Sequence, residues 1–437
     1  MRVAVIGGGI SGIATAFYLM QHKVEVDLYE STGRIGGRVG SERLHERWVD
    51  FGGKNIGKQY RRFRDFVRAN GNQEFEYLGF NTSQLINGRV VGISKEGAKR
   101  FNMLKVMGLC GIGSVLKLYP HVKVLMKDRE QGALGTDYFR HISERYDHLN
   151  LAEYLGPSCV RHVVRPVTVR MNGAEPDECY PGNFGSNLAL ALDSYEQLKY
   201  GMHGLLDAFR TINPSKLSLL ENHHVDSIFR DPSTNLIVVN ALHQGKQTIA
   251  KYEKVISALP AHQLASVVEK QAPAASTLLR QIRYFPVAVA IAKYRNEVFR
   301  KDRRAMVFDA SLPLSNAGAY GINDLNLVRF TFSGRGARSI ITENTSPDSV
   351  VTLGEKLSSP YFTIKNNERE YFSYKYLKEG LCAYSPNHHV LLEHMDSELE
   401  NHIPGLVTTG DYRRGASIEA CFRAAEESVS KVIGEFF

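Results

Sequence analysis

Cysteine and tryptophan are scarce in this chain of 437 residues, which has five Cys and a single Trp, Trp48. No two cysteines have the C-x-x-C spacing, which argues against a zinc ribbon and against a disulfide framework. We therefore expect a reducing compartment, the cytoplasm. The sequence has no internal repeat and no low-complexity tract, which argues against solenoid and fibrous architectures.

Charge of one sign is only slightly in excess, because Lys and Arg exceed Asp and Glu by 54 − 46 = 8. The basic residues are spread along the chain, so we assign them to solubility and expect no nucleic-acid partner. Hydrophobic residues make up 43% and charged residues 23%, as in ordinary globular proteins. The length predicts two or three domains.

The first apolar segment resembles a secretory signal peptide in composition, but glycines interrupt it. Met1–Ile6 is a short β-branched run typical of a buried parallel strand, Ile13–Gln21 is typical of a helix, and Lys23–Tyr29 is typical of a second strand. Glu30 ends that strand, 18 residues after Gly12. A strand, a G-x-G-x-x-G turn, a helix, a strand and an acid in this order predict dinucleotide binding.

Each position of this motif has a physical role. Gly7 makes the tight turn, Gly9 lets a pyrophosphate approach the backbone, and Gly12 lets the helix pack closely on the sheet. The helix N-terminus presents free N–H groups to the phosphates, and the Glu30 carboxylate accepts ribose hydroxyls. The predicted cofactor contacts here are Gly7, Gly9, Ile10, Ser11, Gly12 and Glu30.

A second loop of glycine and arginine follows Glu30 and favours FAD over NAD. It contains Gly36-Gly37-Arg38 and, a little later, Gly52-Gly53. An NAD domain has no need of this loop, whereas a longer cofactor must be held along more of its length. Arginine pairs with phosphate oxygens, and glycine lets the backbone come close.

With this loop, the sequence resembles the superfamily of FAD-dependent amine oxidases, protoporphyrinogen oxidases and phytoene desaturases. The resemblance continues near the other end, where Gly410-Asp411 follows an apolar run and Ser417-Ile418 begins a helix. It implies that Asp411 binds the ribityl or pyrophosphate part of FAD and that the helix points at the isoalloxazine ring. A weaker match implies that the backbone of Val225 meets adenine.

The resemblance also implies an α/β fold, in which a Rossmann-like FAD-binding domain of the GR2 type is combined with a discontinuous α+β substrate domain. We expect the FAD-binding domain in residues 1–58, 195–265 and 400–437, and the substrate domain in residues 59–194 and 266–399. Composition and periodicity predict strand character in Pro286–Tyr294, Gly318–Ser333 and Glu370–Tyr376, and helices in Ser186–Leu198 and Ala416–Gly434.

Candidate residues for the chemistry precede the last motif. Tyr384 is a candidate wall of the substrate pocket, and His388, or its neighbour His389, is a candidate proton carrier; a histidine in a surface turn is the alternative. Cys382 falls where monoamine oxidases of the superfamily carry a cysteine joined to the flavin. The two glycines that precede that cysteine are missing here, so we predict a buried, unreactive thiol and non-covalent FAD.

Amine oxidases of the superfamily also place a lysine in the strand beneath the flavin. In the similar strand of this chain Val289 occupies that position, and Lys293 lies nearer the strand end, where we expect it to be exposed. The resemblance therefore favours a desaturating or dehydrogenating member with an apolar pocket over a strict amine oxidase.

Residues Phe101–Met126 form an apolar segment with lysines spaced along it. Its charges and glycines make it a poor membrane-spanning helix. Two interpretations remain: a peripheral segment in a membrane interface, with lysines reaching the headgroups, or two amphipathic helices that cover the substrate cavity.

The function that these observations predict is an FAD-dependent oxidoreductase. It would remove a hydride from a C–N or C–C unit of a small, largely apolar substrate and pass the electrons to O2 or a quinone. A non-redox FAD-dependent isomerase or mutase is one alternative, and an escort-type binding protein on the same fold is another. Intact Gly7–Gly12, Glu30 and Gly410-Asp411 motifs disfavour the escort.

Overall fold

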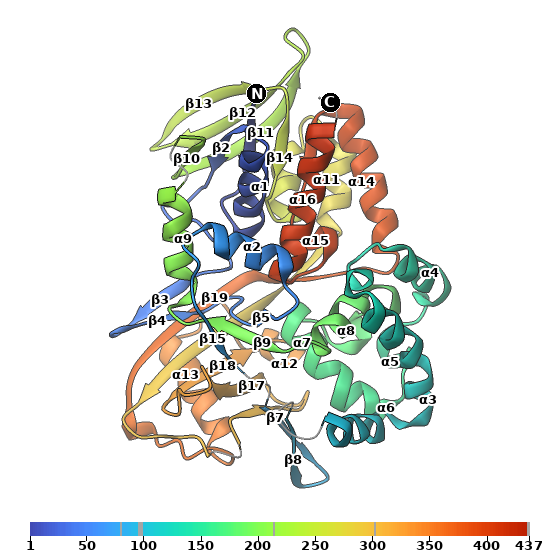
Figure 1. The fold of residues 1–437 in the computed structure, drawn as a ribbon, viewed down its shortest axis with the longest axis vertical. Coiled ribbons are helices and arrows are strands. Elements are labelled where there is room, and N and C mark those ends of the chain that lie inside the picture. The colour runs from blue at the N-terminus through green and yellow to red at the C-terminus, as the bar shows by residue number, and fades with distance from the viewer. Residues whose placement is uncertain (79–80, 95–98, 213–214, 301–302, 435–437) are drawn as a thin grey trace.

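The computed structural model describes residues 1–437 except 79–80, 95–98, 213–214, 301–302 and 435–437. Figure 1 shows two regions: one built on a parallel sheet, near which both termini lie, and one built on a larger mixed sheet flanked by a group of helices. The mixture of parallel sheet and helices confirms the α/β class.

A five-stranded parallel sheet forms the centre of the first region. Its strands come from widely separated parts of the chain and lie in the order β10 (Leu217–Leu220), β2 (Glu25–Tyr29), β1 (Arg2–Ile6), β14 (Val255–Ser257) and β20 (Leu406–Thr408). Every residue of β1 after Arg2 is buried, because helices or strands cover both faces of the sheet. The strand predicted at Met1–Ile6 is therefore confirmed.

Two helices from opposite ends of the chain pack against each other beside this sheet. They are α1 (Ile10–Gln21) and α16 (Ile418–Gly434), joined by an edge-to-face contact between Tyr18 and Phe422. Residues 10–20 of α1 are all buried. A three-stranded antiparallel sheet of β11 (His223–Asp231), β12 (Leu236–His243) and β13 (Lys246–Tyr252) covers the upper part of the region (Figure 1).

A seven-stranded sheet forms the second region. Neighbouring strands run antiparallel except β7 and β16, which are parallel. The order is β19 (Arg369–Ala383), β15 (Arg283–Tyr294), β18 (Leu327–Phe332), β17 (Leu314–Ala319), β16 (Ala305–Val307), β7 (Asn81–Ile86) and β8 (Arg89–Ser94). β19 is 15 residues long and reaches from the outer edge of this sheet to the parallel sheet's region.

The remaining elements connect and cover these sheets. Small strands form the pair β3 (Ser41–Leu44) and β4 (Arg47–Asp50) and the set β5 (Ile56–Gly57), β9 (Tyr195–Leu198) and β6 (Phe75–Tyr77). The other α-helices of four or more residues in the described part of the chain are α2 (Arg61–Ala69), α3 (Lys99–Lys127), α4 (Asp137–Tyr146), α5 (Leu151–Tyr154), α7 (Arg165–Asn172), α8 (Gly185–Ala191), α9 (Gly201–Ile212), α10 (Ala261–Val268), α11 (Pro273–Arg280), α12 (Arg335–Arg338), α13 (Pro347–Ser358), α14 (His388–His402) and α15 (Asp411–Arg414).

Two sequence-based assignments differ from the structure. The helix expected over Ser186–Leu198 ends at Ala191, and Tyr195–Leu198 is strand β9 instead, because its backbone pairs with β5 and β6. The strand expected over Gly318–Ser333 is two strands, β17 and β18, which fold back on each other around a turn. Pairing with distant segments decided the first case, and local composition does not report it.

Helix α3 is bent. Gly111 has φ +71° and ψ 156°, so the helical path breaks there, and Pro120 lies in the second part. One face of this second part packs on the neighbouring helices through Leu118 and Leu125. Residues Met103–Lys127 are long and apolar enough, by length and composition, to cross a membrane.

Candidate functional site

A cavity of about 1150 Å³ extends from the carboxyl ends of the parallel strands to the inner face of the seven-stranded sheet. It is lined by β1 and β2 ends, by the loop after β2, by the N-terminus of α16 and by residues of β15, β18 and β19. Open α/β sheets bind ligands at the carboxyl ends of their strands, so the position is the expected one.

The turn between β1 and α1 forms one end of the cavity. A Cβ on Gly9 would have no atom within 4 Å and would project into open space, whereas a Cβ on Gly12 would overlap the carbonyl oxygen of Gly7. Gly9 is the N-cap of α1, and no side chain caps the helix. The first backbone amides of α1 are therefore available to an anion beside Gly9.

Glu30 closes the same turn from β2. Its carboxylate accepts hydrogen bonds from the backbone N–H of Gly8 at 3.0 Å and from the backbone N–H and hydroxyl of Thr32, each at 2.8 Å. It is buried yet lines the cavity. These bonds fix the carboxylate at the ribose position that the fingerprint predicts.

The Gly/Arg loop lies against this turn. The backbone N–H of Gly36 donates to the Gly8 carbonyl at 2.7 Å, which joins the two loops. A Cβ on Gly52 would overlap the carbonyl oxygen of Arg38, so the segment after β4 also lies in direct contact with the loop. Three glycines, Gly8, Gly36 and Gly52, therefore bring three chain segments together at backbone distance.

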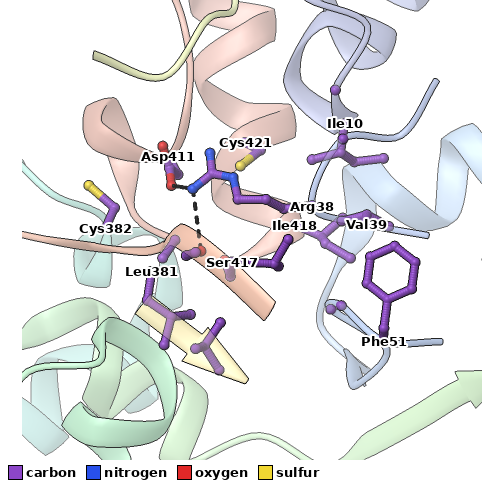
Figure 2. A pocket seen from close by; sticks show the side chains of 18 of the residues that line it. Ile10, Arg38, Val39, Phe51, Leu381, Cys382, Asp411, Ser417, Ile418 and Cys421 are labelled. Carbon is purple, nitrogen blue, oxygen red and sulfur yellow. Dashed lines mark hydrogen bonds and ion pairs between the residues drawn. The ribbon is translucent and has the colours of Figure 1, made fainter. Parts of the chain in front are cut away.

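Arg38 reaches from this loop to the last motif of the chain. Figure 2 shows its guanidinium bonded to the Asp411 carboxylate, at 2.6 Å, and directed at the Gly380 carbonyl, at 3.5 Å. The second oxygen of Asp411 accepts the hydroxyl of Tyr284 at 3.0 Å. Because the Arg38 side chain remains 32% exposed, its other N–H groups face the cavity and are available to a phosphate.

Most of the residues predicted to contact the cofactor line this one cavity. They are Gly7, Gly9, Ile10, Ser11, Glu30, Gly36, Gly37, Arg38, Gly52, Gly53, Val225, Asp411, Ser417 and Ile418. Gly12 and Gly410 do not line the cavity but allow the backbone path around it. Gly12 lies in direct contact with the Gly7 carbonyl oxygen, and Gly410 has a φ of +141° at the start of α15.

The two residues predicted to be catalytic, Tyr384 and His388, do not line the cavity, and this corrects the sequence-based assignment. β19 ends at Ala383, and the chain then turns behind the wall. The Tyr384 hydroxyl donates to the Asp411 carbonyl at 3.0 Å, and His388 Nε2 lies 2.8 Å from the Tyr412 carbonyl. Burial lowers the pKa of His388 to about 4, and both side chains are bonded to backbone carbonyls of residues 411–412.

Cys382 does line the cavity, with no exposed surface of its own. Burial raises the pKa of its thiol well above the ordinary value, and the nearby Asp411 carboxylate acts in the same direction. A protonated thiol is a poor nucleophile, which agrees with the prediction of an unreactive cysteine.

The inner face of the seven-stranded sheet forms the other half of the cavity. Val287 and Val289 of β15 and Leu377 of β19 give it an apolar wall, whereas Lys293 lies outside it. The sequence analysis missed the cations of this half: Lys54, Arg170, Arg304 and Arg329. Lys54 directly follows Gly52-Gly53, and Arg329 is an isolated charge in an apolar strand. Both positions could therefore have been identified as candidates from their sequence neighbours.

The residues present fit FAD. The open space beside Gly9, the free amides of α1 and the partly exposed Arg38 form an anion cradle of the kind a pyrophosphate needs. Glu30 and Val225 lie where the adenosine would be held, and the N-terminus of α16 at Ile418 faces the middle of the cavity.

Comparison with known proteins agrees with this geometry. A solved structure of an engineered putrescine oxidase superposes with a TM-score of 0.77 at 12% identity over 99% of both chains. A putative protoporphyrinogen oxidase from Exiguobacterium sp. 255-15 gives 0.72 at 15% identity, also over 99% of both chains. These likenesses show the fold.

Matches to curated sequences are short. Zeta-carotene desaturase of Synechocystis sp. is 48% identical over 56 residues, which are 13% of this chain and 10% of the relative, so the match spans only a tenth of that protein. The family profile, in contrast, matches residues 10–433. With that match over nearly its whole length, the chain belongs to the family of flavin containing amine oxidoreductases.

Proposed function

We propose that the protein is an FAD-dependent oxidoreductase that removes a hydride from a C–N or C–C unit of a small organic substrate and passes the electrons to O2 or a quinone. One observation carries the proposal: the cofactor cradle at Gly9 and Arg38 and the apolar wall at Val289 belong to the same continuous cavity. A substrate against that wall would meet the inner end of the cofactor. The domain division given above and non-covalent binding of FAD are part of this proposal.

In this scheme the chain's own residues hold the cofactor and the substrate and orient them. When bound, FAD would supply the hydride acceptor. The N-terminus of α1 and Arg38 would bind its phosphates, Asp411 fixes Arg38, and Val287 and Val289 would keep water from the reacting carbon. Val289, near which the sequence analysis puts the lysine position of amine oxidases, lines the cavity on β15 and carries no titratable group.

Anaerobic reduction tests the proposal. The purified protein should show the visible absorbance of oxidised flavin, and this should bleach when amines or polyenes that are substrates are added without O2. Flavin that stays oxidised while substrate is converted would support an isomerase or mutase. Protein that binds no FAD would support an escort-type protein and contradict the proposal.

We also propose that α3 contacts a membrane surface. In its second part the buried positions Ser114, Leu118, His121 and Leu125 follow a helical period. The opposite stripe is apolar and open to solvent: Ile112 (82% exposed), Leu116 (69%), Tyr119 (62%) and Met126 (75%). An apolar stripe on the outer face of a helix bent at Gly111, with lysines beside it, suits a lipid interface.

Vesicle flotation tests this contact. We expect the protein to float with vesicles of phosphatidylcholine and phosphatidylglycerol and the double variant Ile112→Ser, Leu116→Ser to remain in solution. Ile249→Ser is the matched control, because Ile249 is 62% exposed on β13, outside α3. Equal flotation of the double variant and the control would contradict the proposal.

A further inference from the structure

Lys54, Arg170, Arg304 and Arg329 line the substrate half of the cavity, and each comes from a different element; Lys378 of β19 also lines the cavity, next to Glu379. Lys54 follows β4, Arg170 belongs to α7, Arg304 directly precedes β16, and Arg329 belongs to β18. The acids that line the cavity lie elsewhere. Glu30, Asp226 and Asp411 belong to the dinucleotide turn and its neighbours, and Glu379 lies near the end of β19.

None of these four cations forms an ion pair with a carboxylate of the described residues. Lys54 Nζ donates to Gln197 Oε1 and to the Tyr320 carbonyl, both at 2.6 Å. Arg329 donates to the carbonyls of Phe51, at 3.0 Å, and Gly52, at 3.2 Å.

The two remaining cations have still fewer partners. Arg304 donates to the Ile322 carbonyl at 2.5 Å, and its Nε is buried and has no hydrogen-bond partner among the described residues. Arg170 has no hydrogen bond or ion pair within the part of the chain that the structure describes, although it faces the cavity.

The cations repel one another. Burial lowers the pKa of Lys54 to about 7, and the charges of Arg329 and Arg170 act in the same direction. Burial likewise lowers the pKa of Arg329 to about 10, and Arg170 contributes to this decrease. Three positive charges therefore lie within electrostatic reach of one another.

The nearest carboxylates compensate this group only in part: Asp50 and Asp324 oppose the decrease in the pKa of Lys54, and Asp50 also opposes that of Arg329. Asp50 accepts hydrogen bonds from the Ser41 hydroxyl, at 2.5 Å, and the Met202 backbone N–H, at 3.0 Å, and Asp324 is paired with Arg47. Neither Asp50 nor Asp324 lines the cavity. Lys54 is buried, Arg304 and Arg329 are half-buried, and Arg170 is exposed and lines the cavity, so a ligand that carries the counter-charge would stabilise this group.

We propose that the substrate carries a carboxylate, which binds between Arg170, Lys54 and Arg329, and an apolar body, which lies on the wall of Val287 and Val289. This inference rests on the proposed function and names the substrate class of the same site. Guanidinium groups bind carboxylates with paired hydrogen bonds, and Arg170 has its donors free for this. An amine cation of the same size would be repelled.

Short-chain ligands of matched length test the charge preference. Octanoate, octylamine and octanol are titrated into the FAD-loaded protein, and binding is followed by the change in the visible spectrum of the flavin. We expect octanoate to bind most tightly and octylamine most weakly. Isothermal titration calorimetry repeats the comparison with a readout that does not need the flavin.

Arg170→Gln is the main variant, because the side chain bears no partner that the fold would lose. We expect it to weaken octanoate binding by about 10- to 100-fold, the value of one charged hydrogen-bonding partner, with octanol binding unchanged. Arg161→Gln is the matched control, since Arg161 lies on the surface, paired with Asp309, and should leave octanoate binding as it is. Arg170→Glu should reverse the order of octanoate and octylamine.

Two results would overturn the inference: octylamine binding as tightly as octanoate, or octanoate binding to Arg170→Gln within twofold of the unaltered protein. FAD content, measured after acid release, is scored separately. An unaltered protein without FAD contradicts the proposed function, while calorimetry still decides the carboxylate site. Loss of FAD from Arg170→Gln alone would assign Arg170 to the cofactor and likewise overturn the inference.

Discussion

Gly9→Val is expected to separate cofactor binding from folding. The backbone at Gly9 is extended, with φ −70° and ψ 177°, which valine adopts without strain, and a Cβ there meets no atom within 4 Å. Valine is a weaker N-cap than glycine, so we expect the free energy of unfolding of the FAD-free protein to fall by about 1 kcal/mol or less.

The effect on FAD should be much larger. The side chain would fill the space beside the amides of α1, and losing two hydrogen bonds to a charged phosphate costs roughly 3–6 kcal/mol. That corresponds to about 10²- to 10⁴-fold weaker binding. The assay is the FAD-to-protein ratio after purification, followed by titration of FAD into the FAD-free protein.

Gly12→Ala is the matched comparison. Its Cβ would overlap the Gly7 carbonyl oxygen, so α1 must move away from the sheet, at a cost of about 1–3 kcal/mol or more in unfolding free energy. Gly12→Ala should thus destabilise the protein even without FAD, whereas Gly9→Val should not. Gly9→Val protein that purifies with one FAD per chain would refute the reasoning about the cradle.

Other outcomes follow from the same geometry. Asp411→Ala should weaken FAD by about 10-fold, less than Gly9→Val, because it frees the arginine that it orients without filling the cradle; a loss equal to that of Gly9→Val in FAD titration would contradict this. Acid precipitation should leave the flavin in the supernatant, with or without Cys382→Ala; colour in the pellet that Cys382→Ala releases would show a covalent bond. His388 should be neutral in the folded protein, so its contribution to stability is full above its unfolded pKa of about 6.5 and decreases as the pH falls toward 4. His388→Asn should make the melting temperature fall less between pH 7 and 4 than in the unaltered protein. Parallel curves of melting temperature against pH would contradict this. At pH 7 His388→Asn should keep the rate of flavin reduction, because the side chain lies outside the cavity, and a 100-fold decrease would restore its catalytic assignment.

The cofactor half of the site could be predicted from the sequence because its rules are local. Gly7, Gly9, Gly12 and Glu30 lie within one strand-helix-strand unit, where spacing alone fixes the geometry. Resemblance was needed for Asp411, which meets Arg38 across 373 positions of the chain. Tyr384 and His388 were expected to face the cavity, and in the structure they do not line it. The sequence does not show that β19 ends at Ala383, and the turn after this residue directs the following side chains away from the cavity.

The substrate half could not be predicted because no local rule joins its parts. Lys54, Arg170 and Arg329 stand in a loop, a helix and a strand, and only the packed sheet brings them to one space. For the same reason β9 was assigned to a helix: its hydrogen-bond partners β5 and β6 lie more than 100 residues earlier.

The last strand and helix, β20 and α16, have a consequence for synthesis of the chain. β20 completes the sheet that begins with β1, and α16 packs on α1, so the earliest and latest parts of the polypeptide depend on each other. During translation, Gly9 and Arg38 emerge long before Asp411 and Ile418 exist. The nascent chain must keep the apolar surface of α1 from aggregation until α16 has been synthesised, and FAD can bind in full only after Asp411 and Ile418 have left the ribosome.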